Sequence, residues 1–153
     1  LACAQENFER LGIAEQVQLQ QADLFPKTDT KADLIVCNPP WLPAKAAAPI
    51  ERAIFDEKSQ MLKGFLLGVG AHLSAHGQAW LVMSDFAEHL GLRGANEIAN
   101  LIEQAGLRVL KKHDIRPQHG KVFDTTDPLH LARSQEITSL WCLNLAADVQ
   151  QIP

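Results

Sequence analysis

Four consecutive residues, Asn38-Pro39-Pro40-Trp41, bring together a side-chain amide, two rigid rings and an aromatic face. They directly follow the stretch Ala32–Cys37, which is rich in apolar side chains and predicts a strand with both faces covered. The four residues therefore come at the carboxyl end of a strand. Ligands of open parallel sheets bind at that edge, which makes these residues the first candidates for a functional site.

The chemistry of this stretch suits a planar amino group. A residue before proline is held in an extended conformation, and two prolines fix two φ angles and remove two backbone donors. The side-chain oxygen of Asn38 and the carbonyl of Pro39 are therefore two acceptors on a stiff segment. Trp41 offers a flat face on which a conjugated group can stack. The alternative is an ordinary turn with a buried tryptophan.

An Asn-Pro-Pro-aromatic segment after a strand ending in Asp-x-Ile-Val-x resembles the signature of class I S-adenosylmethionine-dependent methyltransferases. More narrowly, it resembles the branch that methylates amino or amide nitrogens. That branch includes adenine-N6 DNA methylases, guanine-N2 ribosomal RNA methylases and release-factor glutamine methylases. The resemblance implies S-adenosyl-L-methionine as the cofactor and the residues Asn38, Pro39, Pro40 and Trp41 as the catalytic segment.

The same resemblance implies a cofactor-binding role for Asp23, Leu24 and Asn38. Asp23 follows a predicted strand and would accept a hydrogen bond from the adenine amino group. Its alternative role is that of a cap or loop carboxylate, because aspartate is common after strands.

Hydrophobic periodicity and turn residues predict the elements that position these side chains. A helix starts at Leu1 and is stopped by Gly12, and Gly77 and Gly106 mark later turns or helix ends. Residues 116–136 form a long polar segment, and the tail after Ala146 is expected to fray. The other predicted elements are strands at Val17–Asp23, Ala32–Cys37, Ala79–Met83, Leu107–Ile115 and Ser139–Ala146, and helices at Met61–Leu73 and Ile98–Ala105.

Alternating strands and helices predict an α/β fold with a Rossmann-like, mostly parallel sheet. The last two strands have no helix between them, so the last strand is expected to be antiparallel. Relative to the family pattern, residues 1–153 resemble a single, partial methyltransferase domain without its first two strands and its Gly-rich loop. The missing strands would leave an apolar sheet edge, and we expect either a homodimer across it or an unusual packing of the leading helix and strand.

Composition separates the substrate classes only weakly. The net charge of −4 is not typical of a nucleic-acid binder. A basic stretch could nevertheless contact phosphates, although a solvated strand and loop is the favoured interpretation. Its cationic residues are Arg108, Lys111, Lys112, Arg116 and Lys121.

Cys3, Cys37 and Cys142 are widely spaced, which predicts free and largely buried thiols in a reducing compartment. No apolar run reaches the length of a membrane span, and no signal-peptide pattern is recognisable, so we expect a cytoplasmic protein without membrane contact.

Three further features of the sequence concern residues outside the Asn38 segment. Residues 42–50 form an Ala/Pro-rich loop that is a candidate substrate-side flap. Asp56 and Glu57 precede the long helix and are expected to interact with its positive end. His72 and His76 are four residues apart, but without a third ligand they do not predict a metal site.

Three functions remain open. The first is an N-methyltransferase acting on an exocyclic amino group of a nucleic-acid base, in RNA rather than DNA. The second is a protein glutamine-amide N-methyltransferase. The third is a catalytically incompetent fragment that acts as an interaction module. The basic stretch favours the first function, and the acidic balance elsewhere favours the second.

Overall fold

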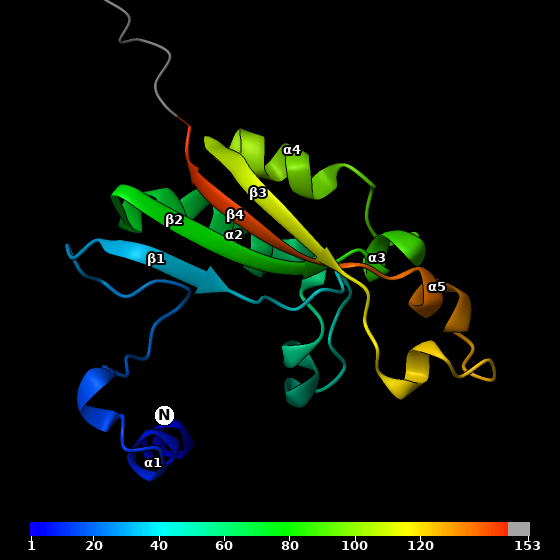
Figure 1. The fold of residues 1–153 in the computed structure, drawn as a ribbon, viewed down its shortest axis with the longest axis horizontal. Coiled ribbons are helices and arrows are strands. Elements are labelled where there is room, and N and C mark those ends of the chain that lie inside the picture. The colour runs from blue at the N-terminus through cyan, green and yellow to red at the C-terminus, as the bar shows by residue number, and fades with distance from the viewer. Residues whose placement is uncertain (147–153) are drawn as a thin grey trace, which may run out of the picture. The chain divides into compact units, whose positions relative to one another are not determined.

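The computed structural model describes residues 1–146, so the tail expected to fray lies outside the described residues. The chain divides into two compact units, Leu1–Thr30 and Lys31–Pro153, and Figure 1 shows the course of the chain through both.

The first unit contains helix α1 (Ala2–Arg10) and a 3-10 helix at Ala14–Gln16. Gly12 has a φ of 68° just after α1, as the sequence predicted for a helix end. The strand predicted at Val17–Asp23 is absent, and that prediction was wrong. A strand needs a neighbour to receive its backbone hydrogen bonds, and no strand in the described part of the chain pairs with this segment.

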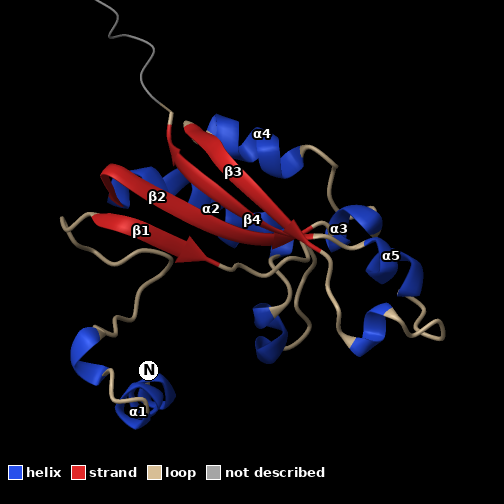
Figure 2. Ribbon diagram, in the orientation of Figure 1, coloured by secondary structure: helices blue, strands red, loops and turns tan. Residues whose placement is uncertain are grey.

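The second unit is built on a four-stranded sheet (Figures 1 and 2). Its strands are β1 (Ala32–Cys37), β2 (Leu73–Ser84), β3 (Leu107–Ile115) and β4 (Thr138–Leu145), in the order β1-β2-β4-β3. β1 and β2 are parallel, whereas β4 is antiparallel to both β2 and β3. β1, β2 and β3 therefore share one direction, and the prediction of an antiparallel last strand in a Rossmann-like α/β sheet is confirmed.

Two helices that contact each other, α2 (Gln60–Val69) and α4 (Glu97–Gln104), pack on the sheet. Alternate residues of β2 are fully buried because they face these helices, as the period of two along a strand requires. The buried core includes Leu62, Leu66, Val69, Ala79, Leu81, Met83, Ile102 and Leu143.

The short helices α3 (Phe86–His89) and α5 (His130–Gln135) lie near the ends of β2 and β3 in Figure 1. Helix α5 and a 3-10 helix at Gly120–Val122 occupy part of the predicted polar segment 116–136.

Gly77 does not form the predicted turn but lies within β2. A Cβ atom at Gly77 would come within 2.7 Å of the carbonyl oxygen of Ala32 in β1, so this glycine permits the two backbones to approach. The predicted helix Met61–Leu73 likewise ends as an α-helix at Val69, because β2 already begins at Leu73.

The predicted interaction of Asp56 with the following helix is confirmed. Its two carboxylate oxygens accept hydrogen bonds from the backbone N–H groups of Met61 at 2.9 Å and Leu62 at 3.1 Å. Lys58 and Ser59 have positive φ angles of 58° and 56°, which is costly for residues with a side chain. The carboxylate of Asp56 satisfies the helix N–H groups that this sharp entry leaves open.

β1 differs from its prediction, because none of its residues is fully buried and one of its faces is exposed. Leu34 and Val36 are 46% and 60% exposed and pair in register with Gln78 and Trp80 of β2. The helices α2 and α4 contact each other and pack over the opposite side of the sheet, where Ala79 is fully buried. β1 is also an edge strand, with β2 as its only strand neighbour in the described residues.

We predict that this exposed edge drives self-association. Val36→Lys places a charge on the apolar edge and should shift the protein toward the monomer, because charged edge strands resist pairing. Light scattering after gel filtration measures the change over a range of concentrations. Ile50→Lys is the matched control, since Ile50 is 84% exposed but lies outside the sheet. A wild-type protein that is monomeric throughout would contradict the prediction.

Candidate active site

The structure keeps the four residues after β1 together as a rigid segment. The indole Nε1 of Trp41 donates a hydrogen bond of 3.1 Å to Oδ1 of Asn38. An indole N–H only donates, so this contact identifies the end of the Asn38 amide that carries the oxygen. Trp41 therefore holds the Asn38 side chain through its polar edge.

Asn38 keeps acceptor capacity after this contact. An amide oxygen has two lone pairs, and Trp41 uses one of them. The carbonyl of Pro39 makes no hydrogen bond within residues 1–146. Two acceptors on one fixed backbone segment are thus available to a group with two N–H protons.

A buried arginine that follows α3 in the chain, Arg93, holds the same segment. Nη2 of Arg93 donates a 2.7 Å hydrogen bond to the carbonyl of Trp41, and the Arg93 side chain is 1% exposed. Its Nη1 lies 3.7 Å from Oε2 of Glu88, an ion pair too long for a hydrogen bond. Burial raises the pKa of Glu88, and the nearby Arg93 charge opposes that rise.

The predicted flap is a closed loop. Its base is a bridge between Leu42 and Phe55, with the N–H of Leu42 donating to Ile54 at 3.3 Å and the N–H of Asp56 donating to Leu42 at 2.8 Å. Within the loop, the carboxylate of Glu51 accepts from two backbone N–H groups at 2.7 and 3.2 Å. These contacts hold the loop in one conformation beside the Asn38 segment.

A cavity of about 470 Å³ opens beside these residues. One wall is the predicted segment from Asn38 to Trp41, continued by Leu42 and by Ile54, which lies beyond the predicted flap. The opposite wall consists of residues that the sequence did not identify as site residues: Phe86, His119, Arg133 and Glu136.

The second wall carries a positive group over an aromatic ring. The guanidinium of Arg133 lies 4.8 Å from the ring centroid of Phe86, and its Nε is 3.1 Å from a carboxylate oxygen of Asp127. The two terminal nitrogens of Arg133 make no hydrogen bond within the described residues. They are therefore available to an acceptor in the cavity.

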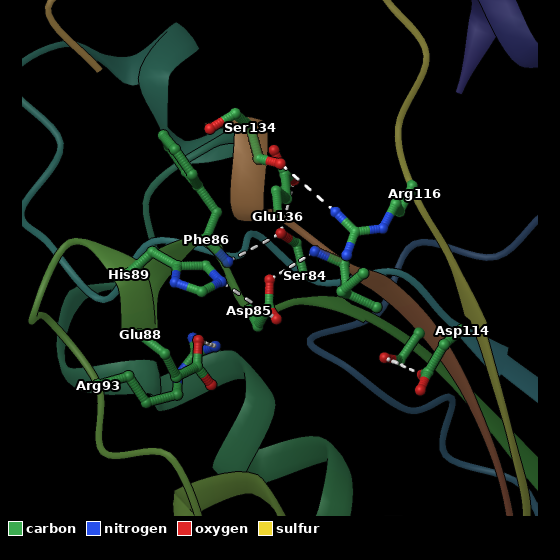
Figure 3. A network of polar contacts seen from close by, with 12 residues as sticks. Ser84, Asp85, Phe86, Glu88, His89, Arg93, Asp114, Arg116, Ser134 and Glu136 are labelled. Atoms are coloured by element: carbon green, nitrogen blue, oxygen red, sulfur yellow. Dashed lines mark hydrogen bonds and ion pairs between the residues drawn. The ribbon is translucent and has the colours of Figure 1, made fainter. Parts of the chain in front are cut away.

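Glu136 is the buried carboxylate of the cavity, with 5% of its surface exposed. Ser84 donates a 2.6 Å hydrogen bond from its hydroxyl to Oε1 of Glu136 and accepts one from the backbone N–H of Phe86 at 3.0 Å. Figure 3 shows this contact beside Asp85, whose Oδ1 accepts from the N–H of Ile137 at 2.6 Å.

The direction of β4 is a signal from which Glu136 could have been predicted as a residue of the second wall. An antiparallel strand begins at the edge where its parallel neighbours end. The register places Ser84, the end of β2, opposite Thr138, the start of β4. Glu136 precedes β4 and must therefore lie near the residues that follow β1 and β2. The predicted antiparallel last strand already contained this signal.

Asp23 and Leu24 belong to the first unit. Leu24 has a φ of 63°, and the N–H of Phe25 donates to the carbonyl of Asp23 at 2.9 Å, which closes a tight turn around Leu24. The carboxylate of Asp23 is exposed and makes no hydrogen bond in the described part of the chain. Its chemistry fits an external amino group.

No group of three or more His, Cys, Asp or Glu side chains that could hold a metal ion occurs among the described residues. None of the described helices is long and apolar enough to span a membrane. The three cysteines are free, but Cys3 is exposed, so the prediction that they are largely buried is wrong for Cys3. Cys3 lies on α1, a helix with no buried residue.

The Rossmann-like sheet is that of a class I S-adenosylmethionine-dependent methyltransferase domain. The model of the RMKL-like methyltransferase domain family matches residues 1–106, and the chain belongs to this family.

Two relatives are similar in sequence. The release factor glutamine methyltransferase of Cereibacter sphaeroides is 29% identical over 118 residues, which cover 70% of this chain and 40% of that protein. The release factor glutamine methyltransferase of Moorella thermoacetica is 37% identical over 73 residues, which cover 47% of this chain and 26% of that protein. The chain thus spans less than half the length of these relatives.

The crystal structure of the (4+2)-cyclase SpnF is similar in fold. The TM-score is 0.56 at 14% sequence identity, and the match covers 94% of this chain and 62% of that one. This likeness supports the Rossmann-like fold.

We predict that Arg93 stabilises the fold and the Trp41 segment. Arg93→Met removes the hydrogen bond to the Trp41 carbonyl and leaves Glu88 without its cation. Loss of one partner of a buried pair should lower the free energy of unfolding by about 3 kcal/mol, measured by urea denaturation. Arg52→Met is the control, because the exposed side chain of Arg52 makes no hydrogen bond in the described residues. Equal losses in both variants would contradict the role of Arg93.

A second prediction concerns Cys37, next to Asn38. Burial raises the pKa of the Cys37 thiol to about 11, so almost none of it is thiolate at pH 8. Iodoacetamide at pH 8 should therefore modify the exposed Cys3 long before Cys37, as followed by peptide mass spectrometry. The reactivity of Cys37 should rise steeply between pH 9 and 11. Equal rates for the two thiols at pH 8 would refute this.

Proposed function

We propose that the protein to which this chain belongs transfers a methyl group from S-adenosyl-L-methionine to a planar amide or amino nitrogen. The observation that carries the proposal is the acceptor pair in the cavity, Oδ1 of Asn38 and the carbonyl of Pro39, held by Trp41. When bound, the cofactor supplies a methyl group on a sulfonium, which is already a good leaving group. The protein's task is thus to position and activate the nitrogen.

The acceptor pair can do both. The lone pair of an amide or exocyclic amine is delocalised into its conjugated system, which makes the nitrogen a weak nucleophile. Hydrogen bonds from its two protons to Asn38 and Pro39 favour a tetrahedral nitrogen and direct the lone pair away from the acceptors. Because Trp41 and Arg93 already hold the segment, little reorganisation is needed when the substrate binds. The nitrogen releases one proton when it is methylated.

We propose cofactor-binding roles for Asp23 and Leu24 in the first unit and for Asn38 in the second. The free carboxylate of Asp23 suits the adenine amino group, and the tight turn at Leu24 presents it. In this proposal both units belong to one methyltransferase domain. A catalytically incompetent interaction module is the alternative, and a whole protein that does not bind S-adenosylhomocysteine would favour it.

We propose a protein glutamine amide as the substrate, the second of the three predicted functions. Both relatives are named release factor glutamine methyltransferases. The basic stretch gives little support to RNA, because three of its side chains have partners within the chain. Arg108 donates to Asn144 at 2.7 Å, Lys112 pairs with Asp114 at 2.9 Å, and Arg116 reaches the carbonyl of Ser134 at 3.5 Å.

Asn38→Ala in the whole protein tests the proposed function. Turnover of a glutamine-containing protein should fall at least about 100-fold, because an acceptor of the reacting nitrogen is lost. The affinity for S-adenosylhomocysteine, measured by calorimetry, should change little. Asn100→Ala on the exposed surface of α4 is the matched control.

The substrate itself is tested in parallel with radiolabelled methyl donor and either glutamine-containing protein or RNA. Label in RNA with a steep salt dependence would favour the nucleic-acid function. Turnover by Asn38→Ala equal to that of the wild type would overturn the assigned role of Asn38.

A further inference from the structure

Resting on the proposed function, we propose that Glu136 binds a backbone N–H of the polypeptide that carries the methylated glutamine. Asn38 and Pro39 account for both protons of the side-chain amide. Glu136 lies on the other wall of the same cavity, where its carboxylate can accept a hydrogen bond from a second N–H group of the substrate. A peptide has such a donor next to every side chain, so the cavity recognises the glutamine together with its backbone.

The first argument is a mostly buried carboxylate that lines the cavity and has one oxygen without a hydrogen bond in the described residues. Glu136 is 5% exposed, and none of the ion pairs among the described residues includes it. Its Oε1 accepts from Ser84, whereas Oε2 has no hydrogen bond within the described residues. A buried carboxylate is costly unless hydrogen bonds compensate it, and an N–H donor from a ligand in the cavity would supply one.

The second argument is that the carboxylate is fixed in place. The Ser84 hydroxyl accepts from the N–H of Phe86, so its own proton points to Glu136. On the chain beside Glu136, the N–H of Ile137 donates to Asp85 at 2.6 Å, and the N–H of Asp85 donates back to Ile137 at 3.1 Å. Figure 3 shows Ser84, Asp85 and Glu136 as neighbours in this network. A binding group held this firmly loses little entropy when a ligand arrives.

The third argument is the complementary group on the same wall. The terminal nitrogens of Arg133 are donors without a partner in the described residues, and the guanidinium rests on the Phe86 ring. A peptide offers a carbonyl acceptor beside its N–H donor. Glu136 and Arg133 together therefore match the two polar groups of a peptide backbone.

The test uses two probes with the same side-chain amide. N-acetyl-glutamine N-methylamide has two backbone N–H groups, and in its analogue both are replaced by ester oxygens. We expect calorimetry on the wild-type whole protein, with S-adenosylhomocysteine present, to show at least about tenfold weaker binding of the ester analogue. In Glu136→Gln this difference should disappear, because the variant keeps an acceptor for Ser84 but replaces the carboxylate.

Glu103→Gln, on the exposed surface of α4, should keep the wild-type difference between the probes. The comparison of probes on the wild-type protein does not depend on the folding of any variant. Equal affinities of the two probes for the wild type, or no binding of either, would overturn the proposal. An unchanged difference in Glu136→Gln would also overturn it.

A methyl-transfer assay on the same amide probe separates this proposal from the proposed function. Tighter binding of the amide probe, lost in Glu136→Gln, supports the role of Glu136 even if no methyl group is transferred, and then only the proposed function fails. Methylation with equal affinities for both probes supports the function and refutes the role of Glu136.

Discussion

The antiparallel pairing of β4 between β2 and β3 is the constraint on which the second unit depends. Because β4 runs against its neighbours, it begins where they end. The register of Ser84 with Thr138, and the hydrogen bonds between Asp85 and Ile137, fix this junction. The segment between β3 and β4 is thereby held at the edge where β1 delivers Asn38, and two distant stretches form one cavity.

A second line of contacts holds the wall that Asn38 to Trp41 form. Arg93 holds the carbonyl of Trp41, and Trp41 in turn holds the amide oxygen of Asn38. The buried guanidinium is poorly compensated, since its Nε and Nη1 make no hydrogen bond among the described residues. The desolvation of such a group offsets part of the stability that its contacts with Trp41 and Glu88 contribute. Its position is better explained by the precision that it gives to the acceptor segment.

The sequence predicted most elements of the second unit because each has a strong local signal. The bounds of β1 and β3 agree with the predicted ranges, and Gly106, with a φ of 68°, stops the helix before β3. The Asp56 cap was also readable from its place before an apolar helix. The wrong predictions concern which segments pair as strands and which strand faces are exposed to solvent. The stretch Val17–Asp23 alternates like a strand but has no strand neighbour among residues 1–146, and β1 is apolar but exposed on one face.

By itself, the sequence determined the fold class and one half of the candidate site. Asn38 to Trp41 are contiguous, and the prolines fix their backbone locally, so no distant residue is needed to recognise them. Only the tertiary structure decided the other half. Arg93, Arg133 and Glu136 are far from Asn38 along the chain, and their types alone are those of ordinary surface residues. Their positions follow from strand order and register, which bring residues that are distant along the chain together by long-range pairing.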